Sequence, residues 1–168
     1  MGKGFPLPEA DEEIVLAGGG IGLGPLLYLA KTLEAADRES VLILGVRSAG
    51  LLPSIELPEG TVVCTDDGSS GFKGTPVGWI SRNIPEPHNA QSKVHIYGCG
   101  PAPMLASLAR FAAEKGWKAS LSAEQWMACG VGACMGCALP RPDGKGYLRA
   151  CADGPVFDSA EIDWEAAK

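Results

Sequence analysis

The sequence predicts an α/β fold, a twisted parallel sheet covered by helices, with a small cysteine-rich C-terminal region. Two observations predict the sheet. Short apolar runs typical of buried strands recur along residues 13–122, and amphipathic segments of helical length separate them. Strands that alternate with helices at these lengths form βαβ units. The third observation, four cysteines between residues 129 and 151, sets the C-terminal region apart.

Composition supports an ordinary globular protein. Of the 168 residues, 46% are hydrophobic and 20% charged, which suits one domain with a small appendage. The net charge of -6 argues against nucleic acid as a partner, because such partners favour a basic face. No apolar run approaches the roughly 20 residues of a membrane span. The chain start also lacks the apolar core of a secretory signal, so we expect a cytoplasmic protein without a membrane partner.

The first predicted strand leads into a glycine-rich turn. Residues 1–12 have the composition of a connector, and Ile14–Ala17 is an apolar run typical of a buried strand. Gly18–Gly24 follows, and Pro25 opens a helical stripe. Such a turn presents free N–H groups and the positive end of a helix to an anion such as a pyrophosphate. No register gives G-x-G-x-x-G, so a purely structural tight turn is the alternative.

Two more strands and a helix follow along the chain. Val41–Leu44 and Thr61–Thr65 have strand character, and turn-forming residues dominate 66–74. Residues 76–83 predict a short helix. The second strand runs into Arg47, where the usual dinucleotide fingerprint has an acidic ribose ligand, so NADP is possible as well as NAD.

The next strand, over 94–97, follows a predicted surface loop over 85–89. His95 within it is expected to pack in the sheet rather than bind a ligand. The strand meets Gly98–Pro101, and the helix that follows is expected to end at Gly116, a residue type that favours helix C-termini.

The last predicted core strand covers residues 118–122. Beyond it, residues 138–140 and 147–150 flank a Pro-Asp-Gly turn and predict a hairpin that carries Cys151. The end of the chain, 153–168, is interpreted as a turn and a short terminal segment.

The cysteines give the strongest chemical signal. Their spacing is C-x4-C-x2-C, then thirteen residues and a fourth cysteine, and its first part matches the plant-type spacing for a 2Fe-2S cluster. Intervening glycines let the backbone wrap closely around a ligand. A zinc site usually presents two C-x2-4-C pairs, and a disulfide framework belongs to secreted chains. We therefore predict a cluster, with zinc as the alternative, on Cys129, Cys134, Cys137 and Cys151. Cys64, among β-branched residues, is expected to be a small buried hydrophobe.

The chain resembles the ferredoxin–NADP reductase superfamily, and more closely the electron-transfer subunits of class 1B (NAD-dependent) dihydroorotate dehydrogenases. The cluster segment with its Asp-Gly-Pro-Val-Phe sequence is the most specific part, whereas the nucleotide loops are shared across the superfamily. Trp126 departs from the pattern, because an arginine is expected there. The matching segments cover nearly the whole chain: Gly19–Gly22, Thr65–Ser69, Lys73–Gly74, Tyr97–Pro101, Met127–Cys137, Gly146–Tyr147, Cys151 and Asp153–Phe157.

The resemblance implies a domain order. Residues 13–122 would be a ferredoxin reductase-like NAD-binding domain, and residues 123–168 a 2Fe-2S cluster-binding domain. Residues 1–12 resemble the end of the FAD-binding β-barrel that precedes the NAD domain in the family, and we expect that barrel to be missing here. FAD is then expected only in the full-length protein. The cluster would relay electrons between this FAD and an FMN in a partner catalytic subunit during dihydroorotate oxidation.

The resemblance also implies roles for the nucleotide loops. The pyrophosphate would meet Gly19, Gly20, Ile21 and Gly22, and Asp67 would line the nucleotide site. The nicotinamide would lie beside Gly98, Cys99, Gly100 and Pro101, with Cys99 near the hydride-donating carbon as the candidate catalytic residue. Simple packing of Cys99 between glycines is the alternative.

Three other functions fit the same motifs. Two are enzymes of the same modular design, the small subunit of a sulfide dehydrogenase and that of a bifurcating NADH–ferredoxin–NADP oxidoreductase. The third is not an enzyme but a zinc-binding or redox-sensing adaptor with four cysteine ligands.

Overall fold

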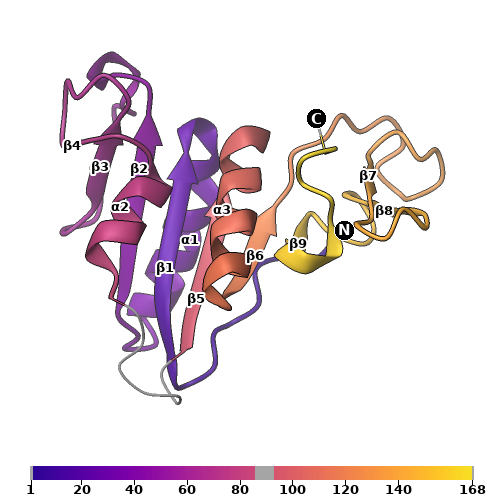
Figure 1. Cartoon of the computed structure of the whole chain (residues 1–168), viewed down its shortest axis with the longest axis horizontal. Coiled ribbons are helices and arrows are strands. Elements are labelled where there is room, and N and C mark those ends of the chain that lie inside the picture. The colour runs from indigo at the N-terminus through magenta and orange to yellow at the C-terminus, as the bar shows by residue number, and fades with distance from the viewer. Residues whose placement is uncertain (1, 86–92, 168) are drawn as a thin grey trace.

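A computed structural model describes residues 2–85 and 93–167. Its main feature is a seven-stranded sheet in the order β4-β3-β2-β1-β5-β6-β9, parallel except for the last pair (Figure 1). A two-stranded hairpin stands beside it. This arrangement confirms the predicted fold class. The sheet strands are β1 (Glu12–Gly19), β2 (Ser40–Val46), β3 (Val62–Thr65), β4 (Phe72–Lys73), β5 (Lys93–Cys99), β6 (Lys118–Ser122) and β9 (Val156–Asp158); the hairpin strands are β7 (Ala138–Pro140) and β8 (Tyr147–Arg149).

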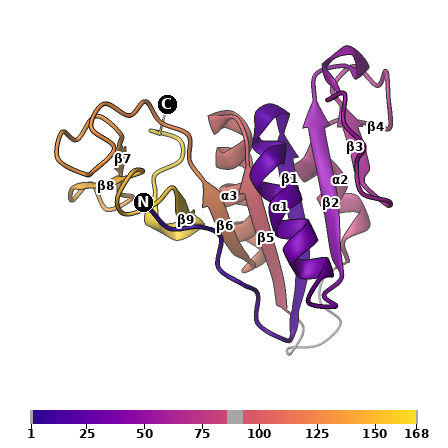
Figure 2. The same ribbon diagram turned by 180° about the vertical axis from the view of Figure 1, so that it is seen from behind.

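Helices cover both faces of the sheet. Helix α1 (Leu23–Glu34) packs on one face, and α2 (Pro76–Asn83) and α3 (Ala102–Lys115) pack on the other (Figures 1 and 2). Strand β1 is therefore almost wholly buried, as expected for a central parallel strand. The predicted end of α3 is confirmed, since Gly116 adopts a left-handed conformation with φ of 66°.

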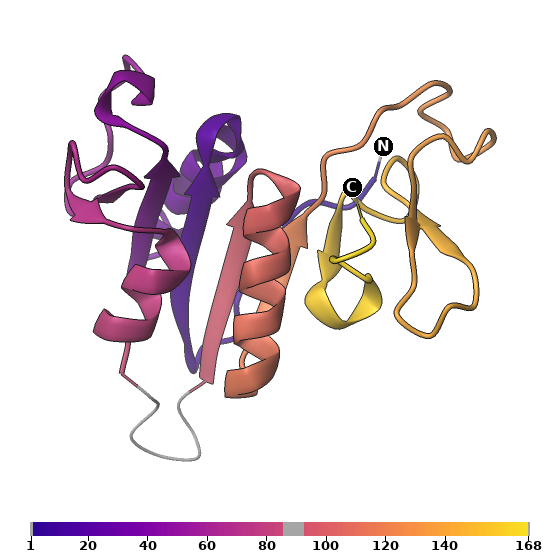
Figure 3. The same ribbon diagram turned by 45° about the horizontal axis from the view of Figure 1, so that its top comes forward.

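The chain end differs from the expected turn and terminal segment. Strand β9 pairs antiparallel with β6, and Phe157 lies opposite Leu121. A 3-10 turn, Ser159–Glu161, follows. The backbone N–H of Asp163 then donates to the carbonyl of Pro140 in β7 at 2.9 Å. This C-terminal segment lies between the sheet and the hairpin (Figure 3), so it joins the two parts. The division at residues 122 and 123 stays a prediction.

His95 packs inside the sheet, as predicted. Its Nδ1 lies 2.9 Å from Glu12 Oε2, and its Nε2 lies 2.9 Å from the Ser120 hydroxyl. Burial opposes the ionisation of Glu12, but hydrogen bonds from Lys118 and His95 outweigh it and lower the pKa of Glu12 to about 2. Cys64 is fully buried, as predicted. The predicted loop over 85–89 lies largely outside the described residues. Among the described helices, none combines the length and apolar character needed to cross a membrane.

Candidate cluster and nucleotide sites

The four predicted cluster ligands lie together in two pairs. The thiol of Cys134 lies against Cys129, and the thiol of Cys151 donates to Cys137. The backbone N–H of Gly132 donates to Cys151 Sγ at 3.1 Å and so brings the first cysteine loop against the second pair. Cys137 and Cys151 are buried, whereas Cys134 is exposed.

Backbone N–H groups surround the sulfurs. Those of Ala133 and Cys134 donate to Cys129 Sγ at 3.3 and 3.4 Å and, with the N–H of Val131, lower the pKa of Cys129 to about 6. The N–H of Cys151 likewise lowers the pKa of Cys137. The pKa of Cys151 is raised instead, because its thiol donates to Cys137. Most of these contacts favour thiolates, which are the form that binds metals.

The two cysteine pairs suit a two-iron cluster. A 2Fe-2S cluster has two irons and four thiolates, so each iron takes two thiolates, and two separate cysteine pairs meet that need. N–H donors directed at ligand sulfurs also suit such a cluster, whose potential depends on them.

The glycine-rich turn lies at the switch point of the sheet. The chain leaves β1 toward β2 and leaves β5 toward β6, on opposite sides, and Gly18 at the end of β1 lies opposite Cys99 at the end of β5. Ligands of open α/β sheets bind in such crevices. Ile21 is 83% exposed, and Gly20 has a φ of 55° that favours glycine.

Several of these glycines are required by packing. A Cβ on Gly22 would lie 2.2 Å from the carbonyl oxygen of Cys99. A Cβ on Gly100 would lie 2.7 Å from Met104 Cε and 3.0 Å from the Gly19 backbone. The loops after β1 and β5 therefore touch through their backbones, which accounts for these glycines without any bound nucleotide.

Cys99 is half-buried at the carboxyl end of β5. Burial raises the pKa of its thiol, and a hydrogen bond with Ser122 opposes this only in part. The thiol is therefore neutral near pH 7. Sequence reasoning missed the parts played by Ser122 and Glu124 at this site. Ser122 forms the hydrogen bond, and the negative charge of Glu124 also raises the pKa of Cys99. The signal was the parallel register, which sets Ser122 of β6 opposite Cys99.

Asp67 lies at the same carboxyl edge, beyond β3. Its carboxylate accepts hydrogen bonds from the Ser69 hydroxyl and N–H at 2.6 and 2.9 Å, which lower its pKa. Its own N–H donates to the Arg47 carbonyl at 3.3 Å. Asp67 thus shapes a loop that is two strands away from the glycine turn.

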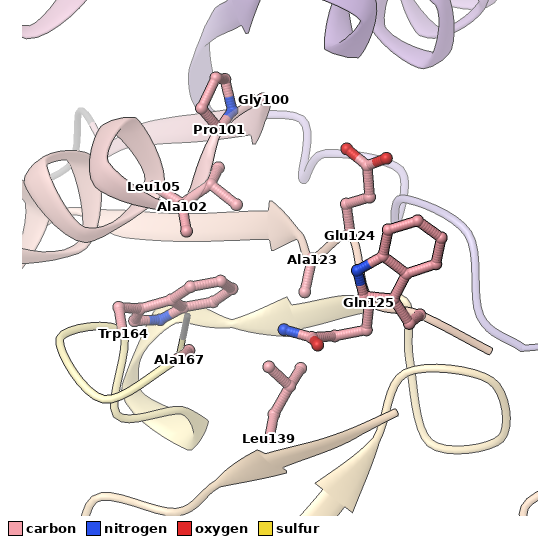
Figure 4. A pocket seen from close by; sticks show the side chains of 11 residues that line it. Gly100, Pro101, Ala102, Leu105, Ala123, Glu124, Gln125, Leu139, Trp164 and Ala167 are labelled. Atoms are coloured by element: carbon pink, nitrogen blue, oxygen red, sulfur yellow. The ribbon is translucent and has the colours of Figure 1, made fainter. Parts of the chain in front are cut away.

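A cavity of about 290 Å³ lies between the start of α3, the segment after β6 and the hairpin (Figure 4). Gly100 and Pro101 line one side, and the segment before the cluster loop lines another. Trp126 and Trp164 are among its lining residues, with Leu139 of the hairpin. Ligand pockets usually measure roughly 300–1,000 Å³. The volume of this cavity is at the low end of that range.

Comparison with known proteins identifies relatives of both sites. Residues 124–163, which include all four predicted ligands, match the iron–sulfur cluster binding domain of dihydroorotate dehydrogenase B. The electron transfer subunit of the NAD(+)-dependent enzyme from Caldanaerobacter subterraneus is 39% identical over 166 residues, which cover 96% of this chain and 63% of the relative. The subunit from Desulforamulus reducens is 35% identical over 172 residues, with coverages of 98% and 64%.

A solved structure has a similar fold. It belongs to an NADH-dependent reduced ferredoxin–NADP oxidoreductase studied for flavin-based electron bifurcation, and it is 28% identical with a TM-score of 0.77. The match covers 98% of this chain and 59% of that one. The chain thus spans less than two thirds of the length of these relatives. Its residues 124–163 are similar to the iron–sulfur cluster binding domain of dihydroorotate dehydrogenase B, and 96–98% of the chain is similar to the electron transfer subunits of that enzyme.

Proposed function

We propose that this chain is the nicotinamide- and cluster-binding part of an electron transfer subunit that works in dihydroorotate oxidation, a step of pyrimidine biosynthesis. It would pass electrons between NAD, FAD and a 2Fe-2S cluster and exchange them with a partner catalytic subunit that holds FMN. The proposal rests on the two cysteine pairs within residues 124–163. The same chain has a glycine turn at the switch point of the sheet.

Each site has a distinct task in this proposal. Free N–H groups after β1 and the N-terminus of α1 would hold the pyrophosphate near Gly19–Gly22. Cys99, half-buried at the carboxyl end of β5, would lie beside the nicotinamide ring. A flavin, when bound, splits the two electrons of a hydride into single electrons for the cluster. The four cysteines would hold that cluster, and the N–H groups around them would tune its potential.

Exposed apolar side chains around the cluster loop support a partner surface there. Trp126 is 92% exposed, Val131 69%, Met127 51% and Met135 47%. Large apolar side chains exposed on one loop suit an interaction site. Cys134 lies exposed in the same loop, so the proposed cluster approaches the surface where the catalytic subunit would dock.

A bifurcating NADH-dependent ferredoxin–NADP oxidoreductase is the second candidate, supported by the similarity of its solved structure. The two functions differ in their electron donors. We would prepare the longer protein, with its flavin barrel and its co-purifying partner, under anaerobic conditions. Dihydroorotate should bleach the cluster absorbance if the first proposal is right. Bleaching by NADPH or reduced ferredoxin but not by dihydroorotate would favour the second.

The chain of 168 residues should bind FAD weakly or not at all while it retains its cluster. A flavin site needs a cavity that buries most of the ring system, and in the family that this chain resembles an FAD-binding β-barrel forms one wall of that cavity. Flavin released from the purified chain would be measured by fluorescence against protein concentration. NADH should reduce the cluster only after the barrel is supplied. One tightly held FAD per chain would contradict this expectation and place the flavin pocket elsewhere.

Replacing Cys99 with alanine should slow flavin reduction by NADH more than it weakens NADH binding, when tested in the flavin-loaded longer protein. Hydride transfer depends steeply on how donor and acceptor are placed, and a smaller side chain loosens that placement. Single-turnover absorbance at several NADH concentrations separates the two effects. Ser122→Ala, which removes the hydroxyl but keeps the thiol, is the matched control and should have the smaller effect. An unchanged rate in Cys99→Ala would assign Cys99 to packing alone.

A further inference from the structure

Arg149, the last residue of β8, reaches from the hairpin to the first cysteine loop. Its Nη1 donates to the carbonyl oxygen of Gly132 at 2.8 Å. Its Nε and Nη2 donate to the two carboxylate oxygens of Asp153 at 2.9 and 3.1 Å. A guanidinium bound by both carboxylate oxygens has a fixed plane and direction, so Arg149 is oriented before it meets the loop.

Asp153 is in turn fixed by the backbone. Its Oδ2 accepts from the N–H of Arg149 at 2.9 Å, and its own N–H donates to the Arg149 carbonyl at 2.8 Å. Arg149 and Asp153 form an ion pair, with 2.9 Å between Nε and Oδ2. Both side chains are half-buried, with 35% and 28% of their surface exposed.

Gly132 connects this pair to the cluster ligands. Its carbonyl binds Arg149, and its N–H donates to Cys151 Sγ. A Cβ at this position would lie 3.1 Å from Arg149 Nη1 and 3.0 Å from Ala152 Cβ, and φ is 79°, so glycine is required for the contact. The guanidinium also lies close enough to Cys137 and Cys151 for their charges to act on it.

We propose that Arg149 is a positioning residue for the cluster: it pins the first cysteine loop through Gly132 and holds a permanent positive charge beside Cys137 and Cys151. Reduction adds a negative charge to a cluster, so a nearby cation raises the reduction potential and a nearby anion lowers it. Asp153 would then help to retain the cluster, because it orients Arg149, and would lower the reduction potential through its own negative charge. The inference rests on the proposed function only in that the chain must hold a cluster.

The sign of the potential shift separates a charge effect from a purely structural one. Arg149→Gln should lower the midpoint potential, and Asp153→Asn should raise it. Both variants should lose iron to a chelator more readily, because outer-shell partners of a metal site typically contribute about 10–100-fold to metal affinity. Arg149→Lys should have a midpoint potential close to that of the unmutated protein, because the positive charge is kept. It should release iron faster, because lysine cannot bind both oxygens of Asp153. Arg141→Gln, in the turn between β7 and β8, is the control for the same change of charge.

The experiment uses the whole 168-residue chain, purified anaerobically, with dye-mediated redox titration followed by visible absorbance and by electron paramagnetic resonance. Potentials that move in the same direction for Arg149→Gln and Asp153→Asn, or that match the Arg141→Gln control, would overturn the proposal. If Arg149→Gln loses its cluster during purification, Arg149→Lys and Asp153→Asn decide the outcome. An unmutated chain without a cluster would instead count against the proposed function.

Discussion

Replacing Cys134 with serine is expected to abolish stable cluster binding while the parallel sheet stays folded. Ligands of an iron–sulfur cluster are thiolates, and a serine hydroxyl does not supply one. Cys134 is exposed, so the change leaves no cavity in the core. We expect anaerobically purified unmutated protein to be red-brown with two irons and two sulfides per chain, and the variant to lose most of both. Iron and sulfide analysis, visible absorbance and far-UV circular dichroism measure these quantities.

Cys64→Ala is the matched control for this change. Cys64 is fully buried in β3, on the sheet and away from the two cysteine pairs, so its loss should cost about 1 kcal/mol of stability without affecting the iron content. Two results would count against the cluster. One is stoichiometric zinc in colourless unmutated protein, and the other is a full complement of iron and sulfide in Cys134→Ser.

Most strands and helices of the sheet could be predicted because they have a local signal. Strand β4 was missed, because turn-forming residues dominate 66–74, yet Phe72 and Lys73 pair with β3. Apolar runs mark β1, β2 and β5, and Gly116 ends α3 where predicted. Strand β9 could not be predicted in this way. It has three residues and follows a Gly-Pro sequence, so its strand character comes from pairing with β6 more than 30 residues earlier. Tertiary pairing of this kind is invisible to local propensity.

The same distinction between local sequence signals and tertiary contacts applies to the candidate sites. The four cysteines could be proposed from the sequence because ligand geometry constrains the spacing of neighbouring ligands. The structure places them in two pairs, and their role as ligands stays a prediction. The role of Arg149 could not be predicted from the sequence, because it depends on a tertiary contact with the carbonyl of Gly132. The glycine turn shows the opposite case: its pattern indicated a pyrophosphate site, yet the structure adds a packing reason for Gly22, the carbonyl of Cys99.

Gly22→Ala should therefore have a large effect even before any nucleotide binds. The added Cβ would lie 2.2 Å from the oxygen and 2.4 Å from the carbon of the Cys99 carbonyl, and 2.6 Å from the Gly100 nitrogen. These are backbone atoms, so relief requires the loops after β1 and β5 to move apart. Overpacking typically costs about 1–3 kcal/mol, and a clash with backbone belongs at the upper end of that range. Urea unfolding followed by circular dichroism measures the loss.

Gly24→Ala is the matched control, two residues along the same chain and inside α1. A Cβ there meets nothing within 4 Å, so alanine should be neutral or should add up to about 1 kcal/mol through its better helix propensity. The two variants should also differ in NADH binding, measured by calorimetry. Separation of the two loops would disrupt the crevice in Gly22→Ala, whereas Gly24→Ala keeps it. Equal stability of the two variants would show that the contact between Gly22 and Cys99 is not a constraint on the fold. Lost NADH binding in a Gly22→Ala protein of full stability would mean that the glycine serves the nucleotide alone.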